Sequence, residues 1–431
     1  MTGSTPEVRV YRWVICACSF LVLFVSQGMT LGGMAVFDIQ LINAISAATG
    51  NEVSVSDVKW RDTIMFLAAA VSGLGSGWLA DKVGVKPLIL IGLAMLAMGN
   101  LLYARVDQLT DAYWISAGLG VVLALCGLMI NVYLISSWFD KYRGLAIGIV
   151  LAGTSLGNAF FPKLNTWMIT TADWRQAFEW LAWIPLILLP IAFFLLKNGP
   201  MSAGKQDVAR DAGAPRELTG YSLGMALRSR NFWLLAIIAM CTFYSILGMT
   251  TNVFIYMSKS DYQPQVASTG VSILFMGGLV GKLISGYLAE NFGRKLILLT
   301  GLVLMFFGGV CLLVAISRTS DTALWAGLIF FGFGWGGIYT LIQLLSPDLF
   351  GMRALGKILA AINILDAAGG AAGPIVTGML YGASGSYFLP FAVITGLLFV
   401  ATIAASLLDM SKAAFLNNLS GTAAETIGEP A

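Results

Sequence analysis

The sequence predicts an all-α membrane protein with twelve transmembrane helices in two pseudo-symmetric six-helix bundles. Its 431 residues are 58% hydrophobic and only 11% charged, whereas a soluble domain carries roughly 25% charged residues. The chain contains twelve apolar runs, each close to the ~20 residues that a helix needs to span a bilayer. A charged motif also occurs twice, about half a chain length apart, which indicates two halves of common design.

The apolar runs fall into two groups of six, separated by a polar linker. The first run, from Trp13 to about Phe37, is too long for the apolar part of a secretory signal and is expected to be a retained helix. The remaining runs lie at about 62–80, 87–104, 112–138, 144–169, 177–196, 232–258, 267–289, 295–316, 322–347, 354–380 and 387–408.

The repeated motif lies between two apolar runs in each half. Residues 77–86 (GWLADKVGVK) recur 209 positions later as residues 286–295 (GYLAENFGRK), with Asp81 and Glu290 at corresponding positions. Glycines permit tight turns and close helix approach. One occurrence alone is equally well explained as an ordinary basic connector, but recurrence at a fixed offset favours a repeated structural element.

The repeat defines four segments along the chain. We expect a first bundle at 1–196, a cytoplasmic linker at 197–230, a second bundle at 231–408 and a cytoplasmic tail at 409–431. Most lysines and arginines outside the apolar runs fall on the side of the N-terminus and the linker. Basic residues concentrate in cytoplasmic loops, so both termini are predicted to be cytoplasmic. A short surface helix is expected around 221–230.

Composition also excludes several classes of function. The chain contains no histidine, which removes His-based metal sites, Ser-His-Asp triads and histidine proton relays. Its five cysteines all fall inside apolar runs, so no disulfide framework is expected. The net charge of +3 is too small to indicate nucleic-acid binding. No cofactor or metal is predicted, and any proton coupling must use Asp, Glu or the bound substrate.

The two copies of the motif and the six-linker-six plan resemble the major facilitator superfamily of secondary transporters. This resemblance implies a monomer with two bundles around a central cavity, alternating access, and a place in the cell membrane, such as a bacterial inner membrane. Three groups of residues resemble the branch of monocarboxylate porters and oxalate:formate antiporters. They are 12–15 with 26–28, 138–148 with 152–153, 162 and 174–178, and 348–351 with 373–374 and 385–387.

Among residues inside the apolar runs, Lys282 gives the clearest indication of a binding site. It lies several residues inside the run 267–289, where a cation is costly unless it faces a cavity or a partner. In the resembling branch a basic residue at this place binds the anion, usually as Arg. Lysine lacks the bidentate fork that suits a carboxylate. The alternative is that Lys282 extends towards the cytoplasmic interface.

Asp366 is the second indication, near the middle of the run 354–380. So short a side chain cannot reach the interface, and a buried acid at this depth is a candidate coupling residue. It could pair with Lys282 when no substrate is bound, since each charge would stabilise the other, but the sequence does not decide whether the two pair. A purely structural role is the alternative. The resembling porters place an acid one helical turn before the basic residue, where this chain has Gly278.

Other polar residues inside apolar runs are weaker candidates for substrate binding. Tyr, Asn and Gln can orient a carboxylate by hydrogen bonds, although contacts between helices explain each of them equally well or better. The substrate-binding candidates besides Lys282 are Gln27, Asn131, Tyr133, Tyr244, Asn252, Tyr339 and Asn363, with Asn158, Trp335 and Gln343 also noted. Asp38, Arg61 and Asp62 lie at outer helix ends, as a gate or a solvated rim. The residues expected to act in gating or structure are Asp81, Lys82, Arg143, Glu290, Arg294 and Lys295.

The preferred interpretation is a secondary transporter of a small organic carboxylate anion in the lipid bilayer. Proton symport and anion exchange both remain open. The alternative keeps the fold but carries a neutral or drug-like solute, which leaves Lys282 without a purpose. A ligand sensor would need a signalling segment, and an enzyme would need an external site that these short loops do not build.

Overall fold

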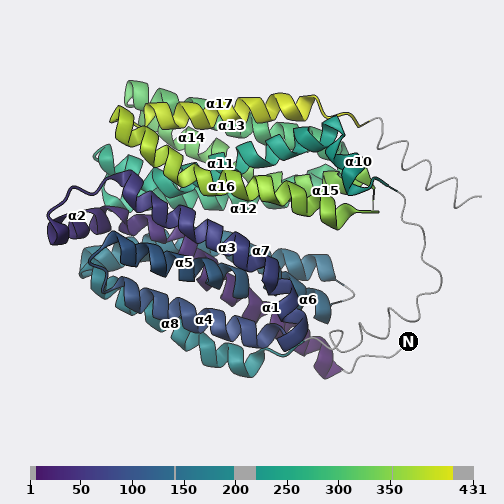
Figure 1. Ribbon diagram of the computed structural model, residues 1–431, viewed down its shortest axis with the longest axis horizontal. Helices are drawn as coiled ribbons and strands as arrows, with labels where there is room; N and C mark the ends of the chain where they lie inside the picture. Colours follow the sequence, from purple (N-terminus) through teal and green to yellow (C-terminus); the bar gives the residue numbers. More distant parts are fainter. Residues whose placement is uncertain (1–5, 140–141, 199–219, 352, 411–431) are drawn as a thin grey trace, which may run out of the picture. The chain divides into compact units, whose positions relative to one another are not determined.

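The computed structural model describes residues 6–139, 142–198, 220–351 and 353–410, and they are predominantly helical (Figure 1). No strand forms among these residues, which contain one isolated antiparallel bridge between Gly220 and Gly351. Apolar runs of this length satisfy their backbone groups inside a bilayer only as helices. The all-α prediction is therefore confirmed.

The described residues of the first half form nine regular helical elements and a π-helical turn. They are α1 (Pro6–Gln27), the π-helical turn (Gly28–Gly32), a 3-10 turn (Met34–Phe37), α2 (Asp38–Thr49), α3 (Val55–Val83), α4 (Val85–Tyr103), α5 (Leu109–Leu125), α6 (Leu128–Trp138), α7 (Arg143–Thr171) and α8 (Trp174–Leu195).

The second half begins with a short helix where the sequence predicts one. Its elements are α10 (Leu223–Leu227), α11 (Arg230–Lys259), α12 (Pro264–Phe292), α13 (Arg294–Arg318), α14 (Asp321–Trp335), α15 (Ile338–Phe350), α16 (Leu355–Ser384) and α17 (Phe388–Ser406).

Eleven stretches of the described residues are long and apolar enough to cross a membrane. The 29-residue helix α3 is the twelfth expected span, and it begins with a charged segment that contains Lys59, Arg61 and Asp62. Three of the eleven stretches consist of consecutive helical segments: the stretch that contains α1 and α2, the pair α5 and α6, and the pair α14 and α15. The sequence predicted single helices there, because hydropathy does not register a break of two or three residues.

The internal repeat extends to these helix breaks. The helix α6 begins at Leu128 and α15 begins at Ile338, 210 positions later. The two copies of the charged motif also turn in the same way. Gly84 and Gly293 separate successive helices with φ of +84° and +91°, a conformation that residues with a Cβ rarely adopt. The predicted tight glycine turns are confirmed in both halves.

Packing divides the chain into two compact units, and α11, α12 and α16 each contribute to both. Unit 1 comprises Met1–Asp211, Gly248–Met276 and Pro374–Pro390, and unit 2 comprises Ala212–Leu247, Gly277–Gly373 and Phe391–Ala431. Within unit 1, α3 packs along α5, and α4 along α8 (Figure 1). The division into bundles at 1–196 and 231–408 stays a prediction.

Small residues bring helices together in both units. In unit 1, a Cβ added at Gly153 of α7 would lie 2.6 Å from the Phe20 carbonyl oxygen of α1. In unit 2, a Cβ at Gly369 of α16 would overlap the Met240 carbonyl oxygen of α11. A missing side chain therefore sets how closely each pair of backbones approaches.

Two glycines of α12 provide a test of this packing. A Cβ at Gly281 would overlap the Phe333 carbonyl oxygen of α14, whereas a Cβ at Gly286 would meet no atom within 4 Å. We expect Gly281→Ala to cost about 1–3 kcal/mol through forced separation of the helices. Gly286→Ala should leave stability unchanged or slightly raised, since alanine favours helix.

The measurement is the apparent melting temperature of purified protein in detergent, followed by the loss of the monodisperse peak in size-exclusion chromatography. Both variants change a glycine to alanine within one helix, so helix propensity is matched. Equal melting temperatures for Gly281→Ala and the wild type would mean that α12 and α14 do not touch at this point.

Candidate functional site

Lys282 lies where α12 crosses the break between α14 and α15. The helix backbones are in contact next to Lys282. A Cβ at Gly281 would overlap the Phe333 carbonyl oxygen, and a Cβ at Gly336 would lie 2.6 Å from the backbone nitrogen of Lys282. The Lys282 side chain is partly buried. The backbone of Lys282 thus lies where α12 closely approaches the break between α14 and α15.

Trp335 occupies the space left by Gly278, one helical turn before Lys282. A Cβ at Gly278 would lie 2.7 Å from Cε2 and Cζ2 of the Trp335 ring. Residues four apart lie on the same face of a helix, so the indole covers the face of α12 that carries Lys282. This is the position at which the resembling porters have an acid. Here an aromatic ring from α14 replaces it, and a side chain at 278 would displace that ring.

Lys282 and Asp366, whose pairing the sequence left open, do not form an ion pair in the structure. Among the described residues, no acid lies within ion-pair distance of Lys282 and no base within that distance of Asp366. The Asp366 side chain is nevertheless buried in α16, at 9% exposure. An unpaired ionisable group inside an apolar helix is costly, and such groups mark ion or substrate paths more often than structural contacts.

Asp366 has polar neighbours on α15. It interacts electrostatically with Tyr339, whose hydroxyl also shares a hydrogen bond with the Gln343 side chain. Tyr339 is 39% exposed. The structure therefore brings together three residues that the sequence singled out separately, and it supplies a hydroxyl that can exchange hydrogen bonds near the carboxylate.

Gln27 and Asn131 meet at a second place, in unit 1. Gln27 ends α1, and its Nε2 lies 3.3 Å from the Cβ position of Gly127, in the break between α5 and α6. Asn131 donates from Nδ2 to the carbonyl oxygens of Cys126 and Gly127, each at 2.9 Å. Its Oδ1 is buried without a partner among the described residues. The Asn131 side chain thus donates to two carbonyl oxygens at the helix break, and its own oxygen has no hydrogen-bond donor among the described residues.

The remaining candidates lie at other points. Asn252 is buried in α11 and donates to the Gly248 carbonyl at 3.0 Å and to Thr251 Oγ1 at 3.1 Å. Tyr244 is buried just over two turns earlier in the same helix, whereas Tyr133 and Asn363 are half-buried. Asn158 accepts a hydrogen bond from the Gly32 backbone at 3.0 Å, which is a contact between helices.

The predicted gating residues are described only in part. The side chains of Asp81, Arg143 and Glu290 lie outside the described part of the structure, and Lys82 is exposed. Arg294 pairs with Asp348 at 2.6 Å and donates to the Leu344 carbonyl at 2.8 Å. Lys295 donates to the carbonyl oxygens of Ser406 and Leu408, at 2.9 and 2.6 Å. These bonds join the start of α13 to the ends of α15 and α17.

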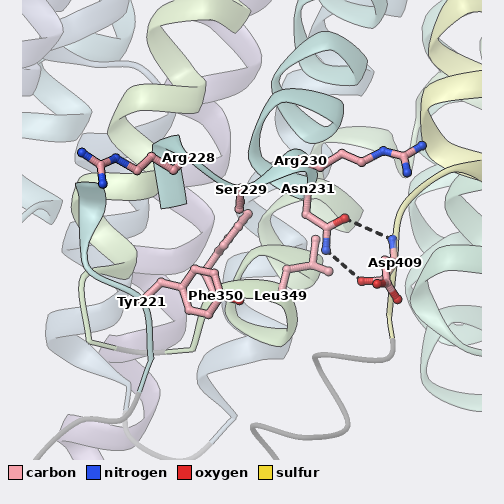
Figure 2. A pocket seen from close by; sticks show the side chains of 8 residues that line it. All are labelled: Tyr221, Arg228, Ser229, Arg230, Asn231, Leu349, Phe350 and Asp409. Atoms are coloured by element: carbon pink, nitrogen blue, oxygen red, sulfur yellow. Dashed lines mark hydrogen bonds between the residues drawn. The ribbon is translucent and has the colours of Figure 1, made fainter. Parts of the chain in front are cut away.

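A cavity of about 270 Å³ lies at the start of α11, remote in sequence from Lys282 and Asp366. Figure 2 shows its lining residues, with Asn231 joined to the Asp409 backbone by two hydrogen bonds of 2.8 and 3.1 Å. The guanidinium groups of Arg228 and Arg230 point away from each other in this view. The cavity therefore does not focus positive charge on one point, and it contains none of the predicted binding residues.

The sequence did not single out Lys59, yet it lies at the centre of the largest described cluster of charge. Lys59, Asp38, Arg61 and Asp62 are all at least 97% buried. Hydropathy placed them in a loop or at a helix end, where either a gate or a solvated rim was expected. The signal was local: two bases and an acid within four residues, with Lys59 and Asp62 three apart on one face of α3.

These four residues form a closed ring of ion pairs. Lys59 Nζ lies 2.5 Å from Asp38 Oδ2 and 3.3 Å from Asp62 Oδ2. Arg61 Nη2 lies 2.6 Å from Asp38 Oδ1 and 3.0 Å from Asp62 Oδ1. Each carboxylate thus bridges both cations. The solvated-rim interpretation is wrong for Asp38, Arg61 and Asp62, because burial of the ring excludes solvent.

Comparison with known proteins agrees with the helix pattern and the repeat. A family model described as Major Facilitator Superfamily matches residues 16–374 and 261–424. The uncharacterized MFS-type transporter YhjX of Escherichia coli (strain K12) is 25% identical over 317 residues, covering 73% of this chain and 76% of that protein.

Two relatives belong to the branch that the sequence resembles. The oxalate:formate antiporter of Oxalobacter formigenes is 28% identical over 359 residues, covering 81% of this chain and 80% of its own. Monocarboxylate transporter 13 of Bos taurus is 24% identical over 402 residues, covering 90% and 87%. A multi-pass helical chain, an internal repeat and a family match over most of the residues lead to one conclusion: the protein belongs to the Major Facilitator Superfamily of membrane transporters.

Proposed function

We propose that the protein is a secondary transporter that carries a small organic carboxylate anion by alternating access. The observation that carries this proposal is Lys282, an ammonium inside α12 with no ion-pair partner among the described residues. A cation at this depth needs a counter-charge. A substrate carboxylate is the simplest group that supplies it and then leaves.

The surroundings of Lys282 support a small substrate. The Trp335 ring lies against the same face of α12, with Gly278 in contact beneath it. An indole provides a flat apolar wall and one N–H donor, which suits a short acid with a single charged end. The names of two relatives, an oxalate:formate antiporter and a monocarboxylate transporter, agree with this chemistry.

Asp366 is the proposed coupling acid. Its carboxyl group is buried, interacts electrostatically with Tyr339 and has no described base within ion-pair distance. A carboxyl group in this setting can take up a proton at one face of the membrane and release it at the other. Neutralisation of Lys282 by substrate and of Asp366 by a proton would each permit a change of conformation, since a ligand shifts an equilibrium only by binding one state better.

The test is uptake by purified protein in liposomes, across a panel of small mono- and dicarboxylates. Each acid is supplied with an imposed pH gradient or with internal counter-substrate. We expect one class of acid to accumulate above the empty-liposome control, and the effective gradient to distinguish symport from exchange. No accumulation of any acid under either gradient, together with transport of a neutral or drug-like solute, would overturn the carboxylate proposal.

A further inference from the structure

The buried ring of Asp38, Lys59, Arg61 and Asp62 is complete within the first half of the chain. It holds two acids and two bases, and every carboxylate oxygen accepts from a cation. Buried charges are costly unless they are paired. Two acids balance two bases, so the ring is electrically neutral without any group from the second half, although Arg61 Nη1 is buried without a partner among the described residues.

Lys59 makes one further bond, which leaves the ring. Its Nζ donates to the backbone carbonyl oxygen of Thr251 in α11, at 2.5 Å. Thr251 lies inside a helix, where its carbonyl ordinarily accepts from the N–H four residues later. Loss of the bond to Lys59 thus leaves neither partner bare: the carbonyl keeps its helical bond and the ammonium keeps two carboxylates. This bond is the reversible part of an otherwise permanent cluster.

Two more contacts join the halves of the chain in the same unit. The Ser272 hydroxyl of α12 donates to the Ala159 carbonyl of α7, at 2.6 Å. A Cβ at Gly378 of α16 would lie 3.2 Å from both Ser56 Cα and Lys59 Cγ of α3. Helices α11, α12 and α16 therefore all pack on first-half helices here, and the absence of a side chain at 378 lets α16 lie directly over Lys59.

We propose that the ring is a latch that closes this end of the transporter, with the bond from Lys59 to Thr251 as its releasable contact. The two carboxylates, each held by Arg61, orient the Lys59 ammonium towards α11, so the contact re-forms without reorganisation. In the predicted topology this is the outer end of the protein. The proposal rests on transport by alternating access, as proposed above, and is independent of which substrate is carried.

Variants that remove the bond from Lys59 to Thr251 test the latch. Lys59→Met removes the bond to Thr251 but leaves the ring with an unbalanced negative charge, which threatens folding. The double variant Lys59→Met/Asp62→Asn removes the same bond and keeps one acid and one base. Arg175→Met is the matched control, because the Arg175–Asp107 pair of 2.7 Å lies wholly within the first half and its side chains are 35% and 67% exposed, in contrast to the buried ring.

The experiment measures access to Ser268, a residue of α12 that is 1% exposed. Ser268→Cys is introduced into a chain whose five native cysteines are replaced by alanine, and the protein is labelled in liposomes with a membrane-impermeant maleimide. No substrate is added, so the result does not depend on the carboxylate proposal. Loss of a hydrogen bond to a charged group is worth on the order of tenfold in an equilibrium.

We therefore expect labelling on the order of tenfold faster in Lys59→Met/Asp62→Asn, and in Lys59→Met where it folds, with no change in Arg175→Met. A labelling rate unaltered in a folded ring variant would overturn the latch. A second ring variant covers the case in which the first does not fold: Asp38→Asn/Lys59→Met removes the same bond to Thr251 and also keeps one acid and one base. It should speed labelling of Ser268→Cys to the same extent. An unaltered labelling rate in this variant would equally overturn the proposal.

Discussion

Replacing Lys282 with glutamine is expected to abolish uptake of the carboxylate substrate while the protein remains folded. The change removes the charge and shortens the side chain by one atom, but it keeps a polar group at the end. Truncating one partner of a buried charged pair costs about 2–5 kcal/mol, which is about 30-fold to several thousand-fold in affinity. At substrate concentrations near the wild-type KM, uptake then falls to the level of empty liposomes.

Two matched variants give this result its meaning. Lys282→Arg keeps the charge and adds a bidentate fork, so it should retain binding with altered preference among mono- and dicarboxylates. Lys163→Gln makes the same chemical change at an exposed position of α7 and should leave uptake unchanged. Wild-type kinetics in folded Lys282→Gln would remove Lys282 from the site, and the anion proposal would lose its main support.

Asp366→Asn is expected to separate proton-driven uptake from exchange. Asparagine retains the shape and the hydrogen bonding of a protonated carboxyl group, but it cannot release a proton. Uptake driven by a pH gradient should fall at least about tenfold, because the step that requires an ionised group is lost. Exchange of internal for external substrate should continue, since that cycle needs no net proton movement.

The measurement compares the two driving forces in the same batch of liposomes. Asp111→Asn, which changes an exposed acid in the first turn of α5, controls for the loss of one negative charge. If proton-driven uptake and exchange both persist at wild-type rates in Asp366→Asn, this residue is not the coupling acid. Loss of both activities in a folded protein would instead assign Asp366 to substrate binding or to helix packing.

The sequence alone determined the class of the protein and its internal symmetry. The length and hydropathy of the apolar runs are local properties of the sequence. Apolar runs of this length satisfy their backbone N–H and C=O groups inside a bilayer only as helices. The turns at Gly84 and Gly293 were equally accessible, because a left-handed backbone demands glycine wherever the chain folds. The repeat could be recognised from a constant offset in the sequence alone. In the structure it extends further than predicted, to the helix breaks before Leu128 and Ile338.

The tertiary structure alone decided which polar residues meet. It buried Lys59 between Asp38 and Asp62, brought the Thr251 carbonyl to it from 192 positions away, and left Lys282 and Asp366 unpaired among the described residues. Hydropathy averages about twenty residues, so it registers the presence of a charge but not its partner. Whether a charge ends in a solvated loop or a dry ring depends on groups from distant helices, because pairing and desolvation act through space rather than along the chain.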